Sequence, residues 1–181
     1  VSWPDTIEGE YAVGPDGGTI VTDEGCELDF PAGAVSETVV LQVSKLEGSV
    51  PPVTGLFPLS DLYSIGPSGT VFDTPVLLTI PYDVELLPSN LAFDDVLIFT
   101  RDGAESSWEE LDGLGADGSV SASIAHLSDF IAGVRCEAVC EGNTCLPIGA
   151  SEICECDACE DGDPCTTDGV CTEGVCESKP K

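Results

Sequence analysis

The single histidine of the chain, His126, is followed directly by Leu127, Ser128 and Asp129. Histidine exchanges protons near neutral pH, and serine and aspartate are its usual partners in nucleophilic catalysis. Hydrolases of this kind often hold the serine in a Gly-x-Ser-x-Gly turn, and the chain contains no such sequence. The local sequence therefore favours a structural role, in which His126 and Ser128 cap the last strands, over a serine hydrolase.

Acidic side chains offer a second kind of chemistry. The chain has 34 Asp and Glu residues against 5 Lys and Arg, a formal net charge of −29. Adjacent pairs such as Asp94-Asp95 and Glu109-Glu110 supply the two carboxylates of a glycosidase only if they face each other across a cleft. At this acidic content such pairs arise by chance, so we expect them on solvated faces and predict no enzyme.

Ten cysteines form the third group, and Cys26 stands apart from the rest. The other nine are Cys136, Cys140, Cys145, Cys154, Cys156, Cys159, Cys165, Cys171 and Cys176. A zinc site would need paired Cys-x-x-Cys units, and only Cys156 and Cys159 have that spacing. The even total favours five disulfides, one joining Cys26 to the tail, with the pairing left open. Such a framework indicates an oxidising compartment: secreted, periplasmic or at the cell surface.

Calcium is the one cofactor that we consider, because it prefers oxygen ligands. Four carboxylates lie close together in the tail: Asp157, Asp161, Asp163 and Asp168. Cys165 interrupts the spacing of an EF-hand loop, and Asp16 and Asp23 flank a second candidate loop. A saline medium, which screens charge, is the alternative reason for the acidity.

Short strand-like runs must position these side chains. Nine runs are rich in Val, Ile, Leu, Thr and aromatic residues: 18–23, 27–30, 38–46, 61–66, 76–80, 96–101, 108–111, 119–126 and 130–134. Turn sequences such as Asp102-Gly103 and Asp117-Gly118 separate them, and no window of about 11 residues has a helical period. The pattern predicts an all-β sandwich over residues 14–135, followed by a small, loop-dominated, disulfide-stapled tail over residues 136–181.

The first 13 residues are interpreted as an N-terminal arm. Its large side chains are Trp3, Ile7 and Tyr11. Their spacing suits a helix, but Pro4 and Gly9 favour an extended arm that pairs with a sheet edge of its own molecule or of a neighbour. The three side chains are therefore candidate assembly contacts. Methionine is absent even at position 1, which predicts a processed N-terminus.

Four segments in order have a familiar pattern. They are Gly17-Gly18-Thr19-Ile20-Val21 with Leu28-Asp29-Phe30-Pro31-Ala32-Gly33-Ala34-Val35, then Gly66-Pro67-Ser68-Gly69-Thr70-Val71-Phe72, Pro75-Val76-Leu77-Leu78-Thr79-Ile80-Pro81-Tyr82 and Ala125-His126-Leu127-Ser128-Asp129-Phe130. From residue 14 to residue 134 the chain resembles the ZU-five (ZU5) domain, a β-sandwich of ankyrins, zonula occludens proteins and netrin receptors, with related copies in bacterial secreted proteins. The resemblance implies an interaction module.

The tail has a resemblance of its own. The sequence from Asp161 to Cys171, with Gly174-Val175-Cys176, is similar to the cysteine-rich repeats of myxobacterial and slime-mould surface proteins. The resemblance implies an extracellular matrix or a cell surface.

Some ZU5 relatives cut themselves at a His-Phe-Ser sequence, where the serine attacks the preceding carbonyl with help from the histidine. This chain has Leu127 in place of the aromatic residue. The resemblance therefore implies self-cleavage between Leu127 and Ser128 as an alternative to a purely structural role.

The charge excludes whole classes of partner. A net charge of −29 disfavours binding to nucleic acid or to anionic lipid. The chain also has no run of about 18 apolar residues that would insert into a membrane.

We expect a non-catalytic, secreted or cell-surface structural or adhesion subunit. In its sharper form, this subunit repeats in an extracellular filament or layer. The partner would be another copy, a surface protein or a glycan. The alternative is a monomeric module that binds protein or glycan.

Overall fold

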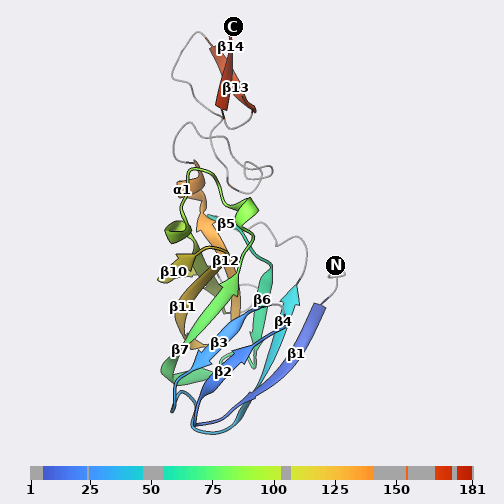
Figure 1. Ribbon diagram of the computed structural model, residues 1–181, viewed down its shortest axis with the longest axis vertical. Helices are drawn as coiled ribbons and strands as arrows, with labels where there is room; N and C mark the ends of the chain where they lie inside the picture. The colour runs from blue at the N-terminus through green and yellow to red at the C-terminus, as the bar shows by residue number, and fades with distance from the viewer. Residues whose placement is uncertain are drawn as a thin grey trace.

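The computed structural model describes residues 6–23, 25–46, 55–102, 107–140, 154, 166–172 and 175–180. Side chains are described for residues 9–23, 25–46, 55–102, 107–139 and 154. Within these ranges most of the regular structure is β-strand, in two antiparallel sheets that pack against each other (Figure 1). The predicted all-β class is confirmed.

The first sheet has seven strands in the order β1-β4-β6-β12-β8-β9, with β5 paired to β12. Their bounds are β1 Thr6–Val13, β4 Val39–Leu46, β5 Leu56–Pro58, β6 Leu62–Gly66, β8 Leu97–Arg101, β9 Glu109–Leu111 and β12 Asp129–Arg135. The second sheet has five strands in the order β10-β11-β7-β3-β2. Their bounds are β2 Gly18–Val21, β3 Glu27–Phe30, β7 Val71–Pro81, β10 Gly113–Ala116 and β11 Ser119–His126.

The remaining elements are short. Two 3-10 turns, η1 Val84–Leu86 and η2 Phe93–Asp95, precede β8, and the helix α1 Cys136–Cys140 follows β12. The strands β13 Thr166–Thr172 and β14 Val175–Pro180 form a separate antiparallel pair. Among the described residues, no helix combines the length and the apolar character needed to cross a bilayer.

The segment expected to be an arm pairs with the sheet of its own molecule. Strand β1 runs antiparallel to β4, from Thr6 opposite Leu46 to Val13 opposite Val39. Tyr11 is half-buried and packs against the core, whereas Trp3 and the side chain of Ile7 lie outside the described residues. Residues 6–13 therefore form an edge strand of the sandwich, and the role of the three side chains in assembly stays a prediction.

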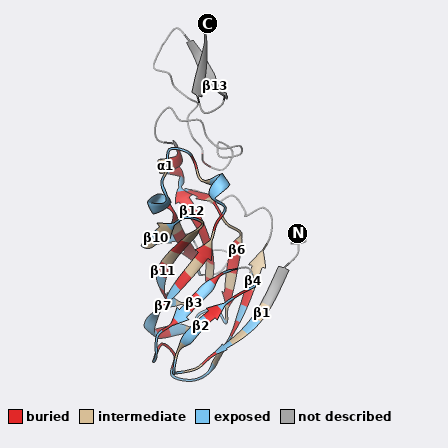
Figure 2. Cartoon of the chain, viewed as in Figure 1, coloured by how far each residue is buried: buried red, intermediate tan, exposed pale blue. Residues whose placement is uncertain are grey.

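Alternating side chains build the core between the sheets. In β11, Val120, Ala122 and Ile124 are buried while the intervening residues are not, which is the period of two that a half-buried strand requires. Fully buried residues come from both sheets: Leu28, Leu41, Ile65, Leu78, Ile80, Ile98 and Phe130. Figure 2 shows the buried residues along the strands of both sheets.

A smaller apolar cluster lies on the outer face of the first sheet. It contains Leu56, Leu62, Phe99 and Ile131, with Trp108 packed against it. Because neighbouring residues of a strand point to opposite faces, Phe99 faces this cluster while Ile98 faces the main core. Both faces of β8 are thus covered by apolar side chains.

Neighbouring leucines of β7 test this arrangement. Leu78 is 0% exposed and Leu77 is 44% exposed. Leu78→Ala should lower the free energy of unfolding by about 2–5 kcal/mol, because it leaves a cavity between the sheets. Leu77→Ala, the matched control, should cost less than about 1 kcal/mol. Urea unfolding followed by tryptophan fluorescence measures both, and equal losses would contradict the assigned faces.

Candidate functional site

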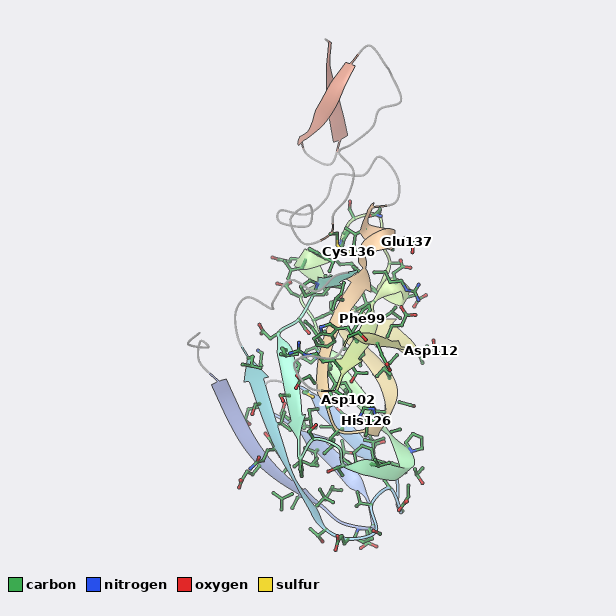
Figure 3. The ribbon with its side chains drawn as sticks, turned by 180° about the vertical axis from the view of Figure 1, so that it is seen from behind. Phe99, Asp102, Asp112, His126, Cys136 and Glu137 are labelled. Carbon is green, nitrogen blue, oxygen red and sulfur yellow. A yellow bond between two sulfur atoms is a disulfide. The ribbon has the colours of Figure 1, made fainter. Side chains whose placement is uncertain are left out.

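A polar pocket of about 270 Å³ lies at the edge of the sandwich, where strand ends of the two sheets meet. Its lining residues are Thr100, Arg101, Asp102, Ser107, Glu109 and His126. They come from the end of β8, from β9 and from the end of β11, so both sheets contribute. Figure 3 shows Asp102 and His126 side by side at this edge.

Strand pairing sets the positions of these side chains. Thr100 of β8 lies directly opposite Glu109 of β9, and residues paired in this way project to the same face. His126 is the last residue of β11, and a shift in register after Ile124 brings it opposite Val71. A local irregularity in β11 therefore places the imidazole beside residues of the first sheet.

One carboxylate oxygen connects His126 with Ser128. The Nδ1 atom of His126 lies 3.5 Å from Oδ1 of Asp102. The Ser128 hydroxyl donates to the same Oδ1 over 3.0 Å and also to the backbone carbonyl of Arg101. Ser128 is only 3% exposed, so these bonds satisfy a buried hydroxyl.

Both backbone polar groups of Leu127 are hydrogen-bonded to the segment around Thr70. The Leu127 N–H donates to the Thr70 carbonyl over 2.9 Å, and the Leu127 carbonyl accepts from the Gly69 N–H over 3.3 Å. Among the described residues, no hydrogen bond joins Ser128 to His126, because Asp102 lies between them. The contacts describe a structural role for Ser128, and cleavage at this peptide stays a prediction.

Arg101 directs its charge to the outer face of the first sheet. Its Nε donates to Oδ2 of Asp129 over 3.2 Å, and its guanidinium carbon lies 4.8 Å from the centre of the Trp108 ring. Cation–π and ion-pair contacts both favour this position. Arg101 is therefore engaged at the outer face, while the carboxylates of Asp102 and Glu109 line the pocket.

The neighbour of Glu109 has a different partner. Arg135 makes two hydrogen bonds to the Glu110 carboxylate, with Nε–Oε2 2.7 Å and Nη2–Oε1 2.5 Å. These bonds lower the pKa of Glu110 and raise the pKa of Arg135. Glu109 and Glu110 alternate along β9 and point to opposite faces, so they do not form a glycosidase pair.

The structure separates the other acidic candidates. Asp16 and Asp23 are exposed and lie beyond opposite ends of β2, and calcium binding at this loop stays a prediction. Asp95 caps η2 by accepting from the Ala92 N–H over 2.8 Å. The tail candidates Asp157, Asp161 and Asp163, and the side chain of Asp168, lie outside the described residues.

The cysteines are described only in part. Cys136, at the start of α1, forms a disulfide with Cys154, and both residues are buried. Cys26 is fully buried in the core between the sheets. The side chains of the other seven lie outside the described residues, so a disulfide from Cys26 to the tail stays a prediction.

Sequence reasoning singled out His126 and Ser128 and noted Glu109, but it missed the pocket. Thr100 carried no signal, and Asp102 was noted only as part of an Asp-Gly turn. The usable signal was the position of Asp102 and Glu109 at the facing ends of two consecutive strand-like runs, 96–101 and 108–111.

Residues 10–94, from β1 to η2, match the family model of the ZU5 domain. ZU5 domains are non-enzymatic domains that mediate protein–protein interactions. A search among curated proteins finds no match to the chain. The pocket residues lie beyond the matched segment, so the family match does not assign them a role.

Removing the Ser128 hydroxyl tests its structural role. Ser128→Ala removes the buried hydroxyl that donates to the Asp102 carboxylate and to the Arg101 carbonyl, and it should lower the free energy of unfolding by about 1–3 kcal/mol. Ser123→Ala, at an exposed position of β11, should change it by less than about 0.5 kcal/mol. Intact mass should be that of the uncut chain in both variants and in the parent. A fragment ending at Leu127 that disappears in Ser128→Ala would establish self-cleavage instead.

The Glu110–Arg135 pair predicts a pH effect. The pKa of Glu110 is lower in the folded than in the unfolded chain, so the pair stabilises the fold above the unfolded pKa of about 4.3. That contribution is lost as the pH falls through the folded pKa, and it is small because both side chains are exposed. NMR titration should show the pKa of Glu110 rising toward its ordinary value in Arg135→Gln. An unchanged pKa would contradict the pairing.

Proposed function

We propose that this chain is a non-catalytic, secreted or cell-surface structural or adhesion subunit that acts by binding other proteins. The observation that carries the proposal is the match of residues 10–94 to a family of protein-interaction domains. The buried contacts of Ser128, which tie strand ends together, also favour a scaffold over a catalyst. The predicted disulfide framework supports an oxidising, extracellular setting.

Assembly into a filament or layer is the sharper form of the proposal. Strand β1 ends the first sheet, so its outer edge offers backbone groups to a neighbouring strand. Calcium is the proposed link between copies, because a divalent cation offsets the repulsion between surfaces of a chain with a net charge of −29. The tail aspartates Asp157, Asp161, Asp163 and Asp168 are the proposed ligands.

A monomeric module that binds a surface protein or a glycan is the second candidate. Like charge on every copy opposes self-association at low salt, and the charge of −29 favours this form in dilute buffer. The two candidates differ in particle size and in their response to calcium.

Light scattering and electron microscopy in millimolar calcium separate the candidates. We expect large ordered particles that dissolve when a chelator is added, because removal of calcium restores repulsion between acidic faces. Magnesium at the same concentration is the matched control and should not replace calcium, since it gives up its water less readily. A monodisperse monomer in calcium and in chelator would contradict the filament and leave the monomeric module.

A further inference from the structure

We infer that the pocket formed by β8, β9 and β11 binds a basic side chain, lysine or arginine, of a partner protein. The inference rests on the proposed function for the protein nature of the partner. The pocket itself rests on separate observations: a buried hydroxyl without a partner among the described residues, two carboxylates and an imidazole.

Thr100 supplies the first observation. Its side chain lines the pocket, the residue is only 5% exposed, and Oγ1 has no hydrogen-bond partner among the residues that the structure describes. A buried hydroxyl without a partner costs free energy, so native proteins seldom leave one in place. A ligand that donates a hydrogen bond here would remove that cost.

The other lining groups select a donor with positive charge. Ionised Asp102 and Glu109 only accept hydrogen bonds. The His126 ring lines the same pocket, with its Nδ1 3.5 Å from Oδ1 of Asp102. Ammonium and guanidinium groups only donate, which complements this set of acceptors. Arg101, the one cation that lines the pocket, is engaged by Asp129 and Trp108.

The size of the pocket is compatible with a single side chain. Its volume is about 270 Å³. Among the described side chains, no group of three or more His, Cys, Asp or Glu residues is arranged to hold a metal ion. The net charge of −29 also attracts basic partners before contact.

The single histidine makes a direct experiment feasible, because its ring protons give isolated NMR signals. The probes are Nα-acetyl-lysine methylamide and its arginine counterpart, titrated into the full chain at pH 8 and constant ionic strength. We expect saturable shifts of the His126 signals with dissociation constants on the order of 1 mM, as is reasonable for one side chain. The neutral Nζ-acetylated lysine probe should produce no saturable shift.

Matched variants locate the binding. Glu109→Gln removes a pocket carboxylate and should weaken binding by about tenfold. Glu110→Gln makes the same change one residue away on the opposite face and should alter binding by less than about twofold. Equal effects of the two variants, or equal binding of the neutral probe, would overturn the inference.

Two further outcomes are informative. Tighter binding of 1,5-diaminopentane than of either amide would identify a free amine as the ligand and overturn the partner side chain. If neither basic probe shifts the His126 signals, the inference about the pocket is overturned. The proposed function is unaffected by that result, because the measurement of particle size in calcium tests it independently.

Discussion

The chain passes from β11 in the second sheet to β12 in the first through only two residues, Leu127 and Ser128. Such a short passage needs every backbone group satisfied, because it runs through the buried edge of the sandwich. The Leu127 N–H and carbonyl bond to the segment around Thr70, and the Ser128 carbonyl accepts from the Ile65 N–H over 2.9 Å. The Ser128 side chain then ties the passage to the end of β8. The spacing of the sheets and the pocket at this edge both depend on these bonds.

The charged side chains are distributed so that the edge of the sandwich beside the β11–β12 crossing is acidic. The three cations whose side chains are described each lie beside a carboxylate: Lys45 with Asp61 at 3.1 Å, Arg101 with Asp129, and Arg135 with Glu110. All three belong to strands of the first sheet. The Arg135–Glu110 pair is exposed and adds little stability by itself, whereas the other two pairs are partly buried. The three pairs hold these cations on the first sheet, and the carboxylates of Asp102 and Glu109 line the pocket.

The strands were predictable where side chains alternate, and the pocket was not. Runs 27–30 and 119–126 coincide with β3 and β11, because each has one buried and one exposed face. Strands β5 and β10 escaped prediction, since three or four residues containing Pro58 or two glycines give no periodic signal. Glu109 was considered with its sequence neighbour, but its structural neighbour is Thr100. Strand pairing between distant segments creates that proximity, and a linear pattern does not encode it.

The position of Asp102 also explains why a serine beside a histidine need not be a nucleophile. A carboxylate is a weaker base than an imidazole, so it removes the serine proton less readily. In this sandwich the Ser128 hydroxyl donates to Asp102 and to a backbone carbonyl, while His126 contacts the same carboxylate from the side of the pocket. One acidic residue therefore fixes the strand crossing on its buried side and offers charge on its open side.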